Sequence, residues 1–160
     1  MNIVQCFTMV VNSQNYDIYK KYLREIISIN TVSSNDDGIC KALEYCKREI
    51  LLNLPNWDIN HDSKGNLIAL NPDFEQSKPA LFLSAHIDTV DAKTEQWVSS
   101  ENPFTALETT THIIGRGAND CKAGVALILF MSFLIKQNLF LHNNIGFLIS
   151  YREEGNREKT

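Results

Sequence analysis

Three short polar clusters carry residue types that could bind a metal ion. They are the pair His86 and Asp88, the single Asp120, and the adjacent pair Glu153–Glu154. A neutral imidazole and carboxylates are the usual ligands of zinc outside purely structural cysteine sites. Asp120 has two oxygens that could bridge two cations, and two adjacent glutamates can offer one ligand and one proton acceptor. These residue types therefore suit a metal site.

Hydrophobic patterns predict the elements that position these clusters. Residues 81–90 begin as a continuous apolar run and predict a strand buried on both faces. Residues 122–137 predict a strongly apolar helix, and residues 145–151 predict a second buried strand. Strand, helix and strand in this order predict a parallel α/β sheet with helices on its faces. Because ligands bind beyond the carboxyl ends of such strands, all three clusters are expected to meet at one edge.

His86 and Asp88 are expected to act as a pair. Two residues that are two positions apart on a strand point to the same face. Asp88 could then accept a hydrogen bond from the imidazole nitrogen that does not face the metal. Such a contact would fix the tautomer of His86 and make it a more basic ligand.

The rest of the chain alternates helical patterns, turns and one short strand. Residues 16–30 and 39–54 predict amphipathic helices, separated by a polar break at 31–37 that holds cap-type residues. Further predictions are a turn at 64–66, a strand at 67–70, a loop at 72–79, an irregular stretch at 91–112 and a tight turn at 115–117.

Composition excludes some classes of function. The 160 residues suit one domain, and 44% hydrophobic with 21% charged residues is ordinary for a globular protein. A formal charge of −4 argues against nucleic-acid binding, and the longest apolar run is too short to span a membrane. Four cysteines without a CxxC pair predict a reduced protein, so we expect a cytoplasmic location. Cys40 and Cys46 lie in a predicted helix, where a buried thiol is the usual state.

Each cluster has a simpler interpretation when it is taken alone. A single His-x-Asp sequence is common by chance, and a Glu-Glu pair is usually a solvated surface feature. Gly115 and Gly117 alone would indicate only a turn. Arg116 and Lys122 could clamp a substrate carboxylate, but we expect them to hold the loop that carries Asp120.

One set of motifs runs through the chain in a fixed order. It consists of Ser84-Ala-His-Ile-Asp-Thr-Val90, Trp97, Pro103-Phe104, Gly115-Arg-Gly-Ala-Asn-Asp-Cys-Lys-Ala-Gly124 and Glu153-Glu-Gly155. This set resembles the zinc-dependent amidohydrolase and peptidase family of acetylornithine deacetylase, succinyl-diaminopimelate desuccinylase, aminoacylase and the glutamate-releasing carboxypeptidases. The resemblance covers the chain from about residue 16 to residue 155, and the run 115–124 is its most specific part.

The resemblance implies a role for each candidate residue. His86 would bind one of two zinc ions, Glu154 would bind the other, and Asp120 would bridge both; cobalt could substitute for zinc. Glu153 would be the general base that takes a proton from a metal-bridging water, and Asp88 would orient His86. The implied reaction is hydrolysis of an amide bond in a small N-acyl amino acid or dipeptide, nearest in motif detail to acetylornithine deacetylase.

The resemblance covers only the N-terminal part of the family's catalytic domain. Residues 16–160 would form that portion after a lead of residues 1–15, with Asp120–Cys121 as a candidate cis peptide bond. A third ligand for each metal and a smaller lid domain would come from sequence beyond the Glu-Glu pair. We therefore expect a truncated α/β domain with a mixed, largely parallel sheet flanked by helices and with weak metal binding. A second chain could complete the site.

Two alternatives to a working enzyme stay open at this point. The chain could be an inactive fragment or an interaction module that keeps the family's fold without turnover. It could also be a plain α/β binding domain without a metal, which requires the motif set to be coincidental. Amine release that depends on zinc or cobalt would separate an enzyme from both.

Overall fold

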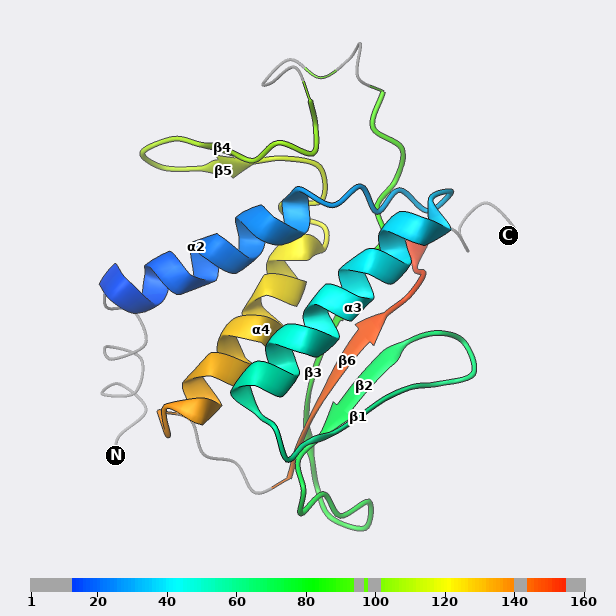
Figure 1. The fold of residues 1–160 in the computed structure, drawn as a ribbon, viewed down its shortest axis with the longest axis vertical. Helices are drawn as coiled ribbons and strands as arrows, with labels where there is room; N and C mark the ends of the chain where they lie inside the picture. Colours follow the sequence, from blue (N-terminus) through cyan, green and yellow to red (C-terminus); the bar gives the residue numbers. More distant parts are fainter. Residues whose placement is uncertain (1–12, 94–96, 98–101, 140–143, 155–160) are drawn as a thin grey trace.

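The computed structural model describes residues 13–93, 97, 102–139 and 144–154, and Figure 1 shows their arrangement. Three helices and six strands lie in these ranges. The helices are α2 (Ser13–Ile27), α3 (Asp36–Asn53) and α4 (Lys122–Lys136). The strands are β1 (Asp58–His61), β2 (Leu67–Leu70), β3 (Leu81–His86), β4 (Leu107–Glu108), β5 (Ile113–Ile114) and β6 (Ile145–Ser150).

Four of the strands form a mixed sheet in the order β1-β2-β6-β3. β3 and β6 are parallel, with His86 opposite Ser150, as the strand–helix–strand pattern predicts. The pairs β1–β2 and β2–β6 are antiparallel, so the mixed sheet is confirmed, but parallel pairing does not dominate it. β4 and β5 form a separate two-stranded sheet.

The helices lie on one face of the four-stranded sheet (Figure 1). α4 packs on β3, and α2 and α3 both pack on α4. Strand residues that face these helices are buried, among them Leu67, Ala69 and Phe147, each 1% exposed. Phe147 stacks on Trp57 with ring centroids 4.9 Å apart. The predicted sheet flanked by helices is therefore confirmed, and the three described helices all lie on the same side of it.

The strand predicted at 81–90 is shorter and more exposed than expected. β3 ends at His86, and its side chains alternate, with Phe82 and Ser84 exposed and Ala85 buried. The prediction that this strand is buried on both faces is therefore wrong. Among the described residues β3 has β6 as its one strand neighbour, so it forms an edge of the sheet.

Local sequence accounts for the start of α3 and for the turn before β2. The Asn35 side chain accepts a hydrogen bond from the Gly38 backbone N–H at 3.2 Å, which satisfies a donor of the first helical turn. Gly65 has a φ of +87° in the turn between β1 and β2, a conformation that glycine adopts without strain.

In the described part of the chain, no helix is both long and apolar enough to cross a bilayer.

Candidate metal centre

His86, the last residue of β3, contacts both predicted aspartates. Its Nε2 atom lies 2.9 Å from Oδ1 of Asp120. Its Nδ1 atom lies 3.0 Å from the backbone oxygen of Asp88 and 3.3 Å from the Oδ1 atom of the same residue. The expected contact between Asp88 and the far imidazole nitrogen is thus present, although Asp88 follows the strand and does not lie within it. The imidazole is held so that Nε2 faces the carboxylate of Asp120.

Asp88 is a fully buried carboxylate that connects three parts of the chain. Its Oδ1 atom accepts a hydrogen bond from the backbone N–H of Glu153 at 2.9 Å, and Oδ2 accepts one from the backbone N–H of Glu154 at 3.0 Å. Oδ2 also accepts a hydrogen bond from the hydroxyl of Ser33 at 2.8 Å. A buried carboxylate requires such donors. Asp88 therefore fixes the Glu153–Glu154 turn relative to His86.

The segment that carries Asp120 is held to the rest of the fold by its neighbours. The peptide bond Asp120–Cys121 is cis, as the family resemblance predicts. Lys122 is fully buried, and its Nζ atom donates a hydrogen bond to the backbone oxygen of Ile29 at 2.7 Å. Burial, with a smaller contribution from the charge of Arg116, lowers the pKa of Lys122 to about 7. These contacts agree with the expectation that Lys122 holds the loop.

Aromatic residues from the motif set pack beside this segment. The guanidinium of Arg116 lies over the Trp97 ring at 5.2 Å, and Nζ of Lys122 lies 5.5 Å from the centre of the Phe104 ring. The backbone N–H of Arg116 also donates to the oxygen of Pro103 at 2.7 Å. Trp97, Pro103 and Phe104 therefore pack against the segment that carries Asp120.

Among the described residues, ligand atoms suited to a metal gather in two groups that share His86. One group holds His86, Asp120 and Cys121, and the other holds His86, Glu153 and Glu154; within each group the ligand atoms lie within 4.8 Å of one another. Nitrogen, carboxylate oxygen and thiolate sulfur are all ligands that zinc accepts. The chemistry of these residues fits a zinc site. Asp120 and Glu154 fall in different groups. That both bind metal in one two-metal site therefore stays a prediction.

The charge around His86 favours its protonated form when no cation is bound. Burial alone would lower the pKa of His86, but the hydrogen bond with Asp120 and the contacts with Asp88 outweigh burial and raise this pKa. An imidazole between two carboxylates is thus surrounded by negative charge. A bound divalent cation would compensate that charge in place of the proton.

Two residues of this centre were missed by the sequence interpretation. Ser33 was expected only as part of a polar break with cap-type residues, and its contact with Asp88 spans 55 positions. Cys121 was counted as an ordinary thiol, although its position next to Asp120 was a signal. Of the other cysteines, Cys46 is buried as expected, but Cys40 is exposed. Gly155, the last residue of the motif set, lies outside the described residues.

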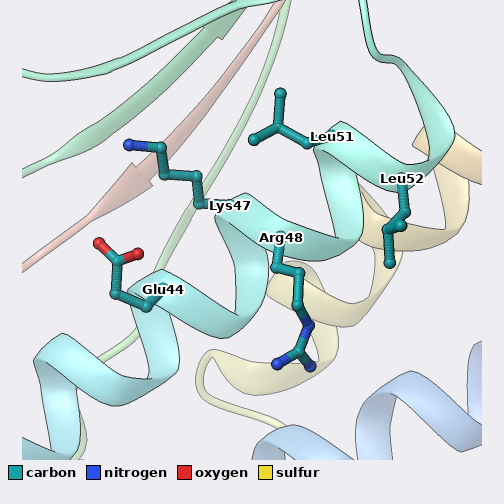
Figure 2. Close-up of a pocket in the computed structure, with 5 residues that line it drawn as sticks. All are labelled: Glu44, Lys47, Arg48, Leu51 and Leu52. Carbon is teal, nitrogen blue, oxygen red and sulfur yellow. The ribbon is translucent and has the colours of Figure 1, made fainter.

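A hollow on the outer face of α3 lacks the metal-ligand groups seen around His86. Its lining consists of side chains from this one helix (Figure 2): Glu44, Lys47, Arg48, Leu51 and Leu52. Leu52 is 61% exposed there, and Arg48 pairs with its neighbour Glu49 at 3.2 Å. The charges are those of a solvated helix face.

Comparisons with known proteins agree with the geometry. The family described as peptidase family M20/M25/M40 matches residues 82–159. Succinyl-diaminopimelate desuccinylase of Rickettsia typhi is 32% identical over 142 residues, and that of Rickettsia felis is 30% identical over 148 residues. Each match covers 86% of this chain and 36% of the relative, so the chain spans about a third of the length of these relatives.

Two solved structures share the fold. An M20 family metallo-carboxypeptidase from Sulfolobus solfataricus matches with a TM-score of 0.69 and 24% identity, over 85% of this chain and 31% of that chain. Human carnosine dipeptidase 1 matches with a TM-score of 0.76 and 16% identity, over 94% of this chain and 34% of that chain. At these identities the likeness shows the fold alone.

Proposed function

Because residues 82–159 belong to peptidase family M20/M25/M40, we propose that this chain carries the first part of a metal-dependent amide hydrolase. The observation that carries this proposal is the position of His86, which belongs to both groups of metal-ligand atoms. The substrate would be a small N-acyl amino acid or a dipeptide. Among N-acyl amino acids, the motif details favour N-acetylornithine, while the R. typhi and R. felis relatives are named as desuccinylases.

Each residue of the centre has a role in this proposal. His86, Asp120 and Glu154 would hold zinc, with Asp120 as the bridge between two ions. Zinc would supply a polarised carbonyl and a water of lowered pKa. Glu153 would accept the proton of that water and pass it to the leaving amine. Asp88 would position His86 and the two glutamates through the bonds described above.

The proposal divides the chain into a lead of residues 1–15 and a catalytic portion of residues 16–160. Catalytic zinc usually has three protein ligands and a water. By the assignment above, each ion would have two of its protein ligands in this chain. The remaining ligands would come from sequence that corresponds to the other two thirds of the relatives. A cytoplasmic location stays a prediction from the cysteine pattern.

Calorimetric titration with zinc, together with an assay for amine release, tests this proposal. The substrates are N-acetylornithine and N-succinyl-diaminopimelate. Two preparations are compared: the chain alone, and the chain together with sequence that corresponds to the other two thirds of the relatives. We expect weak zinc binding by the chain alone and turnover only when the site is complete. Absence of zinc binding in both preparations would contradict the proposal and favour an inactive family fragment.

The variant Glu153→Gln tests the role of the general base in the completed site. We expect it to abolish turnover and leave the zinc content unchanged, because the amide cannot accept the proton. Glu44→Gln on the outer face of α3 is the matched control and should leave both unchanged. Loss of zinc together with activity in Glu153→Gln would show that the roles of the two glutamates are wrongly assigned.

A further inference from the structure

The residues between α2 and α3 contact all three segments that carry candidate metal ligands. This stretch, residues 29–36, is called the positioning segment below; it follows the end of α2 and includes the first residue of α3 (Figure 1). Its partners are residues 87–89, the start of α4 and residues 151–152. Contact with one of these segments would be ordinary packing. One short stretch that contacts all three indicates a shared role.

Backbone hydrogen bonds join the positioning segment to the residues that follow β3. The Thr89 N–H donates to the oxygen of Thr31 at 2.9 Å, and the Ser33 N–H donates to the oxygen of Thr89 at 3.0 Å. The Thr31 hydroxyl, in a fully buried residue, donates to the oxygen of Ile87 at 2.8 Å. The backbone on both sides of Asp88 is therefore fixed.

The Ser33 hydroxyl reaches the carboxylate of Asp88 itself. It donates to Oδ2 at 2.8 Å, and its contact with the backbone oxygen of Thr89 is longer, at 3.2 Å. Oδ2 also accepts from the N–H of Glu154, while Oδ1 lies 3.3 Å from Nδ1 of His86. Because two donors hold Oδ2, the carboxylate cannot turn freely. Oδ1 therefore stays directed at the imidazole.

The start of the positioning segment holds the loop that carries Asp120. The backbone oxygen of Ile29 accepts a hydrogen bond from Nζ of Lys122 at 2.7 Å. A buried ammonium group needs such an acceptor, so this contact is costly to break. Lys122 lies two residues after Asp120, and its attachment to Ile29 limits the movement of that carboxylate.

The end of the positioning segment contacts the residues directly before Glu153. Oδ1 of Asp36 accepts a hydrogen bond from the hydroxyl of Tyr151 at 3.1 Å and another from the guanidinium of Arg152. The Asp36 side chain is 65% exposed, and exposed ion pairs add little to the stability of a fold. The effect of Asp36 should therefore fall on the direction of the Glu153–Glu154 turn.

The positioning segment is ordered by hydrogen bonds of its own. The side chain of Asn35 donates to the backbone oxygen of Asn30 at 2.9 Å, and the Val32 N–H donates to Oδ1 of Asn30 at 3.1 Å. A Cβ atom at Gly38 would lie 1.8 Å from the same backbone oxygen, so glycine lets α3 begin against the segment. Such internal bonding makes the segment a rigid support.

We propose that the positioning segment sets the relative position of the three groups of candidate ligands, with the Ser33 hydroxyl and the Asp36 carboxylate as its positioning groups. This inference rests on the proposed function, because both groups act on that same site through Asp88 and the Glu153–Glu154 turn. Neither group touches the metal. If the segment only packed against the fold, loss of either group would change global stability alone.

Amide hydrogen exchange of the metal-free chain, followed by NMR, tests this positioning directly. Ser33→Ala and Asp36→Asn should each speed exchange of the Glu153 and Glu154 amides at least about threefold. The amides of β6 should keep their rates, because they report global opening of the sheet. Unchanged exchange at both glutamates, or an equal increase throughout β6, would overturn the proposal.

Two variants serve as matched controls. Ser33→Thr keeps the hydroxyl and should keep the exchange rates of the original chain. Asp37→Asn changes the neighbour of Asp36, whose carboxylate pairs with Lys41 at 2.6 Å on the surface of α3, and should have no effect on the glutamates. Faster exchange in Ser33→Thr or in Asp37→Asn would show that the hydroxyl or the Asp36 carboxylate is not responsible, and would also overturn the proposal.

Titration with Co²⁺, followed by its visible absorption, connects the positioning to metal binding. Ser33→Ala should weaken cobalt binding about tenfold, as expected when an outer partner of a ligand is lost, and Ser33→Thr should restore it. Equal cobalt affinity in Ser33→Ala and the original chain would overturn the proposal. A chain that binds neither cobalt nor zinc but shows the expected exchange would support positioning and contradict the proposed function.

Discussion

The two faces of the four-stranded sheet have similar side chains in different surroundings. On the helix-covered face, Ala69 and Phe147 are 1% exposed, while Phe82 on the opposite face, called the open face below, is 47% exposed. Neighbouring strand residues alternate between the two faces, so both come from the same continuous apolar runs. These strands therefore have the composition of a sheet covered on both sides, whereas the described residues cover one side.

The largest expected effect on stability comes from truncating one phenylalanine on each face of the sheet and comparing the two losses. Phe147→Ala should lower the free energy of unfolding by about 3–5 kcal/mol, because it leaves a cavity beside Trp57 in the core. Phe82→Ala should cost about 1 kcal/mol, because its ring is half exposed. Urea denaturation followed by fluorescence measures both. Equal losses would contradict the difference between the faces.

The next effect concerns Asp88, which lies just beyond the carboxyl end of β3. Asp88→Ala should destabilise the fold by about 2–3 kcal/mol, because the hydroxyl of Ser33 and the backbone N–H groups of Glu153 and Glu154 lose their acceptor. Zinc affinity should also fall about 10–100-fold as His86 and the glutamate turn lose their orientation. Thermal unfolding and calorimetry measure the two effects. The exposed Asp91→Asn is the control and should change neither.

A smaller effect is expected at Asn144, which supports the loop beside the open face. Its amide group donates to three backbone oxygens, and its Oδ1 atom accepts from the Glu75 N–H at 2.9 Å. Asn144→Ala should cost about 1–2 kcal/mol and speed hydrogen exchange in residues 75–80. The exposed Asn60→Ala is the control. Unchanged exchange in the loop would show that Asn144 does not hold it.

The smallest effect should come from Gly146→Ala. The added Cβ would lie 2.5 Å from the far end of the Phe82 ring, which must move. Because the open face leaves that ring room to turn away, we expect a loss below about 1 kcal/mol. A large loss of stability in the free chain would show that the ring is fixed.

Strong periodic patterns made most of the fold predictable. The helices now seen as α2, α3 and α4 and the strands β2 and β6 follow their predicted ranges within a few residues. β1 was missed because its four residues contain one buried apolar side chain, Ile59. β4, in the stretch predicted to be irregular, has two residues and no period to detect.

The sequence was sufficient to predict which residues belong to the candidate site and at which strand ends they lie. His86, Asp88, Asp120 and the Glu-Glu pair do meet at the edge where β3 and β6 end, as topology predicts. Contacts between side chains that are far apart in the sequence were not predictable. The contact of Ser33 with Asp88 and the grouping of Cys121 with His86 depend on how distant segments pack, and no local pattern records that packing.

The hydrogen bonds from Glu153 and Glu154 to Asp88 also set an order of events during biosynthesis. They span 65 and 66 positions. The nascent chain therefore cannot bring the two glutamates next to Asp88 and His86 until β6 has left the ribosome and paired with β3. A cation that contacts both His86 and the glutamates would therefore bind only chains that have finished folding. Its affinity would add to the stability of the native state by mass action.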